Sequence, residues 1–254
     1  MSISSFNYDQ AGETYGRSRQ TDPRIAAYVE RAIGEAQTII NVGAGAGSYE
    51  PKDKYVMAVE PSKTMRLQRK EKGRPPAVIG RAEALPFDDR SFDAAMAMVT
   101  IHHWQDMERG IQELRRVSKG PVAILTFAPD ALHEFWNMAY FPEVVEAERK
   151  RYPTMEWLTT TLGGSCQIEA VPIPLDCLDG FQEAFYGRPE AFLNPEVRRN
   201  QSAWGFVSEE TASKGVTKLE ADLQSGKWDK RYGHYRRQPF FVGALRLLVS
   251  TPDH

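Results

Sequence analysis

Three glycines and one acid follow two short apolar runs in the N-terminal part of the chain. Positions 39–47 read I-I-N-V-G-A-G-A-G, so Gly43, Gly45 and Gly47 come directly after a β-branched run. Glycine lets a backbone approach a ligand closely, although a cluster of glycines is also typical of a tight turn. The next apolar run ends at Glu60, and an acid there can accept hydrogen bonds from both hydroxyls of a ribose. The glycines and the acid together predict a nucleoside site.

A dinucleotide dehydrogenase is one alternative for such a site. Its fingerprint is G-x-G-x-x-G with a pyrophosphate seated on a helix N-terminus, whereas the spacing here is G-x-G-x-G. The residues that follow contain an acid and Pro51, which make a poor first turn for a diphosphate. Only twelve residues separate Gly47 from Glu60, so we expect a compact loop in place of several helical turns. These features disfavour the oxidoreductase interpretation and leave it open.

Two adjacent histidines follow a later apolar run. His102 and His103 come just after the run at 92–99, so they lie at the carboxyl end of a predicted strand, where parallel sheets bind ligands. An imidazole there can act as a general base. The structural alternative is that one histidine caps the coming helix and the other packs beside Trp104. We predict no metal site, because no histidine, cysteine or carboxylate stands at ligand spacing.

The elements that must position these residues follow a regular order. Short apolar runs alternate with amphipathic stretches, which is the pattern of a parallel sheet covered by helices. We expect strands at 38–42, 55–59, 77–79, 92–99 and 121–127. We expect helices at 25–33, 63–72 and 107–117.

The character of the chain changes after residue 128. Aromatic-rich helical segments are expected at 132–151, 153–162 and 179–227. A sixth strand is expected at 166–172 and a closing strand at 240–249. This order predicts a helical unit placed before the last strand of the sheet.

Four blocks of this sequence resemble the class I S-adenosylmethionine-dependent methyltransferases, in the small-molecule branch of the ubiquinone/menaquinone and trans-aconitate enzymes. They are residues 39–47, V-E-P-S-K-T-M (59–65), G-R-A-E-A-L-P-F-D-D-R-S-F-D (80–93), and T-I-H-H-W-Q-D (100–106) leading into E-L-R-R-V (113–117). The resemblance is strong over residues 6–128 and weaker for the closing strand. It implies an α/β, Rossmann-like fold: a seven-stranded, mostly parallel sheet with helices on both faces and an antiparallel last strand, plus a helical cap.

The resemblance also implies S-adenosylmethionine as cofactor and S-adenosylhomocysteine as product. On that likeness Gly43 and Gly45 lie against the methionine part, Glu60 holds the ribose, and Arg19 is the candidate for the methionine carboxylate. The implied cofactor-binding residues are Arg19, Asn41, Gly43, Ala44, Gly45, Glu60, Pro61, Met65, Arg81, Ala82, Glu83, Val99 and Thr100. The family usually has Asp where this chain has Asn41 and Arg81. His102 and His103 are the catalytic candidates.

The predicted domains follow from the same pattern. Residues 1–128 form a cofactor-binding core, whose stretch 6–19 resembles the family's lid. Residues 129–239 form a helical substrate cap that includes the sixth strand, and residues 240–254 return to the core as its closing strand.

Composition narrows the range of partners. Of the 254 residues 41% are hydrophobic and 26% are charged, as in ordinary globular proteins. The formal charge is 32 − 34 = −2, and there is no basic block, so we expect neither nucleic acid nor a membrane as partner. No apolar run reaches membrane-spanning length. Two cysteines and a start unlike a signal peptide favour the cytoplasm.

The predicted function is methyl transfer by in-line displacement to a small, apolar or aromatic organic acceptor. We expect an enclosed chamber under the cap, with lining candidates Trp136, Tyr140, Phe141, Trp157 and Phe185. The alternatives are a non-enzymatic cofactor-binding or regulatory module and, less favoured, a nicotinamide-dependent oxidoreductase. The sequence does not specify whether O, N, C or S is methylated, or the oligomeric state.

Overall fold

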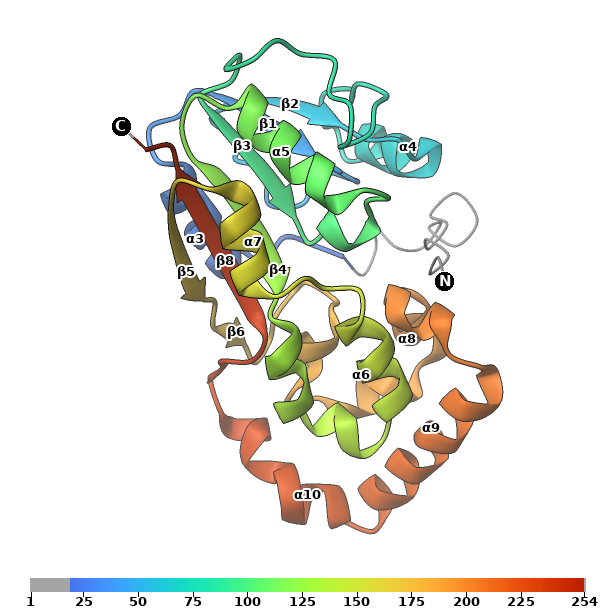
Figure 1. Ribbon diagram of the computed structural model, residues 1–254. Coiled ribbons are helices and arrows are strands. Elements are labelled where there is room, and N and C mark those ends of the chain that lie inside the picture. The colour runs from blue at the N-terminus through green and yellow to red at the C-terminus, as the bar shows by residue number, and fades with distance from the viewer. Residues whose placement is uncertain (1–18, 254) are drawn as a thin grey trace.

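A six-stranded sheet forms one half of the molecule and a helical cap forms the other (Figure 1). The structure is a computed structural model that describes residues 19–253. The strand order is β2-β1-β3-β4-β8-β5, in which β1 to β4 are parallel and β8 runs antiparallel to both neighbours. The strands are β1 (Thr38–Val42), β2 (Tyr55–Val59), β3 (Ala94–Met98), β4 (Val122–Phe127), β5 (Ser165–Ala170) and β8 (Leu245–Thr251). The predicted mostly parallel α/β fold with an antiparallel last strand is confirmed.

The strand count is a correction. The run expected as a strand at 77–79 is only an isolated parallel bridge, between Val78 and Val59 at the end of β2. The chain beside this edge is exposed, since Ile79 keeps 72% of its surface open. The described sheet therefore has six strands and a bridge in place of seven strands.

The closing strand is also shorter than expected. Phe240–Phe241 forms β7, which pairs with β6 (Ile173–Pro174) in a separate two-stranded sheet. The break falls at Gly243, where an added Cβ would overlap the carboxylate of Glu183. That carboxylate accepts hydrogen bonds from the backbone N–H of Ala244 at 2.9 and 3.0 Å. The buried acid therefore bends the chain before β8 begins.

Helices cover both faces of the sheet. Alternate strand residues belong to two hydrophobic clusters, one that includes α3 and the cap and one that includes α5 and α7. The helices are α3 (Pro23–Ile33), α4 (Lys63–Glu71), α5 (Met107–Val117) and α7 (Met155–Leu162). Asp22, Ser62, Asp106 and Thr154 cap their N-termini through side-chain oxygens. Because Asp106 caps α5, the alternative that a histidine caps this helix is wrong.

The connection between β1 and β2 contains no helix. Residues 43–54 form turns and bends only, whereas parallel strands are usually joined through a helix. The compact loop expected from the short spacing and Pro51 is confirmed. One face of the sheet therefore lacks the helix that would lie between α3 and α4.

The cap is built from short helical segments. The expected helices at 132–151 and 179–227 are broken by prolines, which begin the segments at Pro142, Pro189 and Pro195. The α-helices are α6 (Pro142–Arg149), α8 (Pro195–Arg199), α9 (Glu209–Gln224) and α10 (Lys227–Tyr232). The 3₁₀ helices are η2 (Pro129–Glu134), η3 (Trp136–Ala139), η4 (Gln182–Phe185), η5 (Pro189–Leu193), η6 (Ser202–Phe206) and η7 (Gly233–Arg237).

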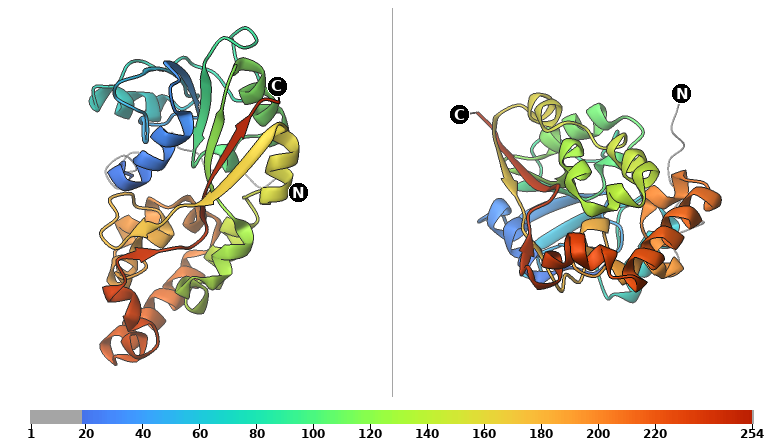
Figure 2. Two further views of the ribbon diagram at one scale, coloured as in Figure 1. Left: turned by 90° about the vertical axis from the view of Figure 1, so that its left-hand side faces the viewer. Right: turned by 90° about the horizontal axis from the view of Figure 1, so that it is seen from below.

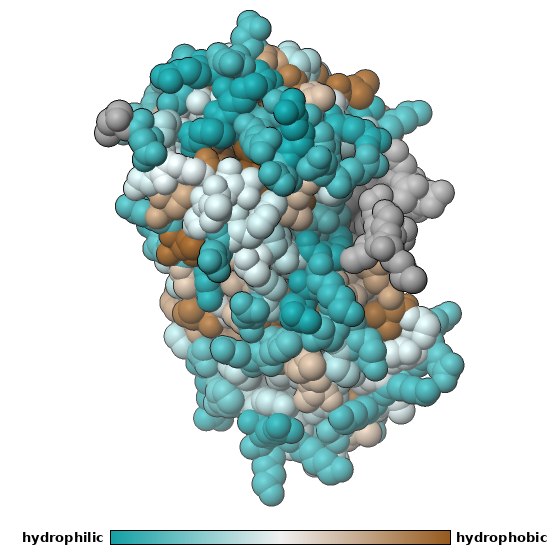
Figure 3. All heavy atoms as spheres, viewed as in Figure 1, coloured by the Kyte–Doolittle hydropathy of each residue, from teal (hydrophilic) through white to brown (hydrophobic). Residues whose placement is uncertain are grey.

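The cap lies beyond the end of β4, where the chain leaves the sheet, and it forms a layer of its own below the sheet (Figure 2). Aromatic packing holds it together: the Trp136 ring lies 5.5 Å from the rings of both Phe192 and Trp228. The face of the molecule in Figure 3 is mostly hydrophilic, with apolar residues scattered over it. No helix within residues 19–253 is long and apolar enough to cross a membrane.

Candidate functional site

The loop after β1 closes onto the end of β2. The backbone N–H groups of Gly43 and Ala44 donate to the carbonyl oxygen of Val59 at 2.9 and 3.0 Å. Gly43 has a φ of 68°, and a Cβ added there would overlap Thr100 Oγ1, so this position requires glycine. A Cβ added at Gly45 would meet no atom of the described residues within 4 Å. Open space therefore stands over the loop, where a ligand can approach the backbone.

Glu60 lies directly after β2 and is buried. Its Oε2 accepts a hydrogen bond from the backbone N–H of Gly45, and its Oε1 accepts one from that of Ser62, each at 2.8 Å. Two backbone donors thus hold the carboxylate against the glycine loop.

The residue before Thr100 has a strained backbone. Val99 follows β3 with a φ of 51°, which is an outlier for a β-branched residue. Its N–H donates to the carbonyl oxygen of Leu125 at 2.7 Å, and this bond helps to hold the conformation. Strain of this kind clusters at functional sites. Here it lies beside Thr100, the residue on which the glycine loop rests.

Two further predicted residues surround the start of α4. Met65 is buried in this helix, and its N–H donates to Ser62 Oγ at 3.2 Å. Pro61 is exposed, and its carbonyl oxygen accepts a hydrogen bond from Arg66 Nη1 at 2.6 Å. The Ser62 cap of α4 therefore fixes the first helical turn, which contains Met65, five positions after Glu60.

The block at 80–93 contributes one buried and two polar residues. Ala82 is buried, while Arg81 is exposed and forms a bridge with Ala84. Glu83 Oε1 accepts hydrogen bonds from the N–H groups of Gln105 at 2.8 Å and Asp106 at 3.2 Å. Glu83 therefore ties this loop to the segment that follows the histidines.

Asn41 faces an ion pair inside the protein. Its Nδ2 donates to Glu50 Oε1 at 2.8 Å, and the same oxygen pairs with Arg69 Nη1 at 2.7 Å. The side chains of Glu50 and Arg69 are each 1% exposed. An Asp at position 41 would set a second carboxylate against Glu50. The amide thus replaces the family's usual Asp because Glu50 needs a donor here.

Arg19 is held by an acid from the segment after β6. Its Nη2 lies 3.2 Å from Asp179 Oδ2, and its Nε also donates to this carboxylate. Tyr49 OH donates to Asp179 Oδ2 at 2.7 Å. Burial, and the Asp179 charge after it, raise the pKa of Tyr49 well above its usual value. The role of Arg19 toward a methionine carboxylate stays a prediction, and the rest of the expected lid lies outside the described residues.

The two histidines form the 3₁₀ helix η1 (Ile101–His103) after β3. The ring of His102 lies 3.9 Å from that of His103 and 4.5 Å from that of Tyr152. His103 Nδ1 lies 3.1 Å from Arg151 Nη2. Burial first, and the Arg151 cation in addition, lower the pKa of both histidines well below the usual value. Both imidazoles are therefore neutral at pH 7, in the form that can accept a proton.

A carboxyl group from α6 completes this cluster. Glu148 Oε1 accepts a hydrogen bond from Tyr152 OH at 3.3 Å, and its Oε2 accepts one from Gln182 Nε2. Burial raises the pKa of Glu148 to about 7. The Arg19 charge acts on the pKa values of Glu148 and of both histidines, so all of them lie near the N-terminal segment. We call five of these residues the polar cap cluster: His102, His103, Glu148, Arg151 and Tyr152.

Sequence reasoning found only the histidines of this cluster. Glu148 lies in α6, whereas Tyr152 lies in the turn after it, so no helical spacing in the sequence pointed to this pair. The partner elements were not visible, because Gln182 and Arg19 come from distant parts of the chain.

The aromatic residues near the histidines are not the ones expected. The Phe127 ring lies 5.4 Å from the rings of both Tyr152 and Phe181. Of the five expected lining residues, Trp136, Tyr140 and Phe141 are buried in the same hydrophobic cluster as Phe127, Phe185 packs against that cluster, and Trp157 packs against the cluster of α5 and α7. Their role in lining an acceptor chamber stays a prediction. Most large aromatics of the cap are thus core residues.

Residues 19–253 contain no group of three or more His, Cys, Asp or Glu side chains that could hold a metal ion. The cysteines, Cys166 and Cys177, are both free. The part of the chain that the structure describes therefore offers chemistry through carboxylates, imidazoles and backbone donors.

Comparisons with known proteins identify the relatives of this chain. Residues 40–126 match the family model described as a methyltransferase domain. A malonyl-[acyl-carrier protein] O-methyltransferase of Halorhodospira halophila is 25% identical over 144 residues, which are 50% of this chain and 49% of that protein. A ubiquinone/menaquinone biosynthesis C-methyltransferase of Citrifermentans bemidjiense is 37% identical over 71 residues, 27% of this chain and 30% of that protein. The chain thus spans about half or less of the length of these curated relatives.

One solved structure matches the cap as well as the sheet. It is a protein of Anabaena variabilis, provisionally described as a methyltransferase from an antibiotic biosynthesis pathway. It has a TM-score of 0.83 at 28% identity and covers 92% of this chain and 99% of that chain. An S-adenosylmethionine-dependent methyltransferase of Thermotoga maritima shares the fold, with a TM-score of 0.58 at 17% identity over 97% of this chain and 98% of that chain.

Proposed function

Because the chain carries a class I S-adenosylmethionine-dependent methyltransferase domain, we propose that it transfers the methyl group of that cofactor to a small organic acceptor. The observation that carries the proposal is the short path from Thr100 to His102. Thr100 supports the glycine loop, and two residues later the His102 ring packs on Tyr152 of the cap. A cofactor on the loop and an acceptor against the cap would therefore lie side by side.

The residues of the strand edge fit the cofactor. Open space over Gly45 admits a ligand close to the backbone. Glu60 is held beside it by two backbone donors, and a carboxylate at the end of the second strand is the group that binds ribose hydroxyls in nucleoside sites. When bound, S-adenosylmethionine supplies a methyl group that a nucleophile can displace. The remaining task of the protein is to hold the acceptor in line and to exclude water, which contributes about 7 to 11 kcal/mol in well-oriented systems.

The polar cap cluster refines the expected acceptor. The rings of Phe127, Phe181 and Tyr152 form an apolar wall, while Glu148 and Arg151 are polar groups beside it. Ligand sites combine such walls with a few placed polar groups. We infer an acceptor that is largely apolar or aromatic and carries one polar or ionisable handle.

The neutral histidines supply a proton acceptor. His102 and His103 both retain some exposed surface, and His102 Nδ1 has no hydrogen-bond partner among the described residues. If the acceptor loses a proton, one of these imidazoles takes it, and a positioned general base contributes about 10² to 10⁴ in rate. The names of the two curated relatives, one for a malonyl group on a carrier protein and one for quinone biosynthesis, support small organic acceptors.

Calorimetry with S-adenosylhomocysteine tests the cofactor half of this proposal. Glu60→Ala removes a charged acceptor of two hydrogen bonds and should weaken binding about tenfold or more. Glu71→Ala, an exposed acid at the end of α4, is the matched control and should leave the affinity unchanged. Equal affinities in both variants would refute the site.

An acceptor screen tests the catalytic half. A library of small aromatic and aliphatic compounds with hydroxyl, carboxyl or amino groups is incubated with S-adenosylmethionine, and formation of S-adenosylhomocysteine is followed. Turnover with at least one compound is expected. Cofactor binding without turnover across the library would favour a non-enzymatic binding module.

A further inference from the structure

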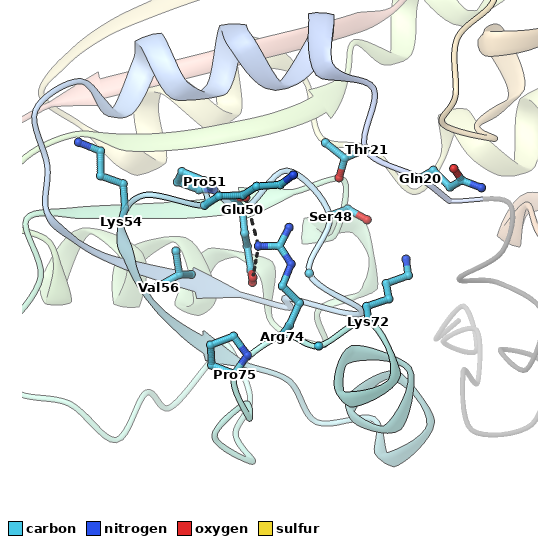
Figure 4. A pocket seen from close by; sticks show the side chains of 13 residues that line it. Gln20, Thr21, Ser48, Glu50, Pro51, Lys54, Val56, Lys72, Arg74 and Pro75 are labelled. Carbon is cyan, nitrogen blue, oxygen red and sulfur yellow. Dashed lines mark hydrogen bonds and ion pairs between the residues drawn. The ribbon is translucent and has the colours of Figure 1, made fainter.

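A cavity of about 700 Å³ lies beside the glycine loop, where the connection between β1 and β2 contains no helix. Figure 4 shows it between α3 on one side and the end of α4 on the other, over β2. It is lined by the loop after Gly47, by Val56 of β2 and by the segment Lys72 to Pro75. The missing connection between β1 and β2 has therefore left a hollow that side chains only partly fill.

Cations dominate the walls of this hollow. Lys52 and Lys54 come from the loop before β2, and Lys72 and Arg74 come from the segment that follows α4. In Figure 4 the Arg74 guanidinium lies near the centre, with Lys72 and Lys54 toward opposite sides. We call these four residues the basic hollow.

The acid in the lining is already neutralised. Glu50 pairs with the buried Arg69 at 2.7 Å and with Arg74 at 3.8 Å. Within the described part of the chain, Lys52 and Lys54 make no ion pair. The basic hollow therefore carries excess positive charge in a protein whose formal net charge is −2.

Such an arrangement is costly unless something balances it. Like charges around a shared cavity repel one another. Burial is the main cause that lowers the pKa of Lys72; the Asp179 charge opposes it, and the Arg74 and Arg19 charges lower the pKa by less. Other arginines of this protein lie against acids, as Arg116 does against Glu113 at 2.7 Å. Among the described residues, the basic hollow has four cations and only one acid in its lining, Glu50, which Arg74 shares with Arg69.

We propose that the basic hollow binds a small polyanion of the phosphate-ester or diphosphate class, at a site separate from the cofactor and acceptor sites. A volume of about 700 Å³ lies in the range of small-molecule sites, which favours a compact ligand over a polymer. Arginine and lysine are the side chains that bind phosphate oxygens, arginine through paired hydrogen bonds.

Occupation of this site should act on the glycine loop. Gly47 and Ser48 line the hollow, and a Cβ added at Gly47 would lie 3.1 Å from Arg74 Cγ. An anion that holds Arg74 and Lys72 therefore orders the same loop that carries Gly43 and Gly45. Because such coupling is reciprocal, the polyanion should tighten S-adenosylhomocysteine binding, and S-adenosylhomocysteine should tighten polyanion binding.

The test uses the full chain and sodium pyrophosphate as probe, with sodium chloride at matched ionic strength as reference. Pyrophosphate is expected to raise the melting temperature saturably and to bind in calorimetry. Lys54→Gln and Lys72→Gln should each weaken its binding about tenfold, the effect of losing one charge-assisted contact. Lys70→Gln, an exposed lysine on α4 outside the hollow, is the matched control and should bind as the parent does.

Three results would overturn the proposal. The first is a melting shift no larger than that of sodium chloride. The second is pyrophosphate affinity that Lys54→Gln and Lys72→Gln leave unchanged. The third is a single-stranded oligonucleotide that displaces pyrophosphate and binds far more tightly, since the site would then be a nucleic-acid surface. Binding of S-adenosylhomocysteine alone is measured separately, so its failure would count against the methyltransferase proposal and not against this site.

Discussion

Glu50 and Glu148 both lie against other parts of the protein, yet the groups that hydrogen-bond to the two carboxylates differ in charge. Glu50 accepts from the cation of Arg69 and the amide of Asn41, whereas the donors to Glu148 are the neutral groups of Tyr152 and Gln182. Burial accordingly raises the pKa of Glu148 to about 7. The region beside the glycine loop, which we call the loop side, is thus stabilised by a buried ion pair. The region of the polar cap cluster, which we call the cap side, instead contains a carboxyl group that can exchange a proton near neutral pH.

The largest expected effect comes from breaking the loop-side pair. Arg69→Met removes the cation that contacts the buried Glu50 carboxylate at 2.7 Å and leaves only Arg74 at 3.8 Å, which should lower the free energy of unfolding by about 3 to 5 kcal/mol. Urea denaturation measures it. The double variant Arg69→Met with Glu50→Leu should lose less, because no charge is then stranded. An equal loss in both variants would mean that packing and not charge holds this region.

The next effect concerns the cap side. His102→Ala should reduce turnover at saturating cofactor about 10²-fold for an acceptor that must lose a proton, with S-adenosylhomocysteine affinity intact. His133→Ala, a partly exposed histidine paired with Glu146 at 2.8 Å, is the control. Because the pKa of His102 is lowered, turnover of the parent should show no loss from its protonation between pH 6.5 and 8. Losses under threefold for both His102→Ala and His103→Ala would leave catalysis to positioning alone.

Glu148 should make stability depend on pH. Its pKa rises from 4.5 to about 7 on folding, so between these values the folded protein keeps a proton that the unfolded chain has lost. Stability therefore falls as the pH rises through this window, by about 1 to 3 kcal/mol for this group. For Glu148→Gln, the difference in free energy of unfolding between pH 5 and pH 8 should be smaller than for the parent protein. Glu183→Gln serves as comparison, because burial raises the pKa of Glu183 to about 8.

The smallest effect tests the neutral donor. Tyr152→Phe removes the hydroxyl that donates to Glu148 Oε1 at 3.3 Å and should cost about 0.5 to 1.5 kcal/mol of stability at pH 8, where Glu148 is charged. At pH 5 the cost should shrink, because the protonated carboxyl needs this donor less. A pH-independent cost would indicate that ring packing against His102 and Phe127 is the main contribution of Tyr152.

Several elements were predicted to the residue. The strands at 38–42 and 55–59 and the helix at 107–117 coincide with β1, β2 and α5, because β-branched runs, helical periodicity and a capping Asp are local properties. The prediction of one strand at 240–249 was wrong, because the carboxylate of Glu183, which is distant in sequence, bends the chain at Gly243. The prediction of long helices in the cap was wrong, because Pro142 and Pro189 each begin a new, shorter helical segment.

The sequence by itself determined the glycine loop and the position of Glu60 beside it. The glycines, Glu60 and the short connection between them lie within one strand-loop-strand unit, so their pattern was sufficient to predict the loop, its acid and the missing helix. Only the tertiary structure decided the rest. The polar cap cluster joins His102 to Tyr152 across fifty positions, and the basic hollow exists because two loops meet where no helix separates them. Contacts between distant segments depend on how the layers pack, and local sequence patterns do not specify that packing.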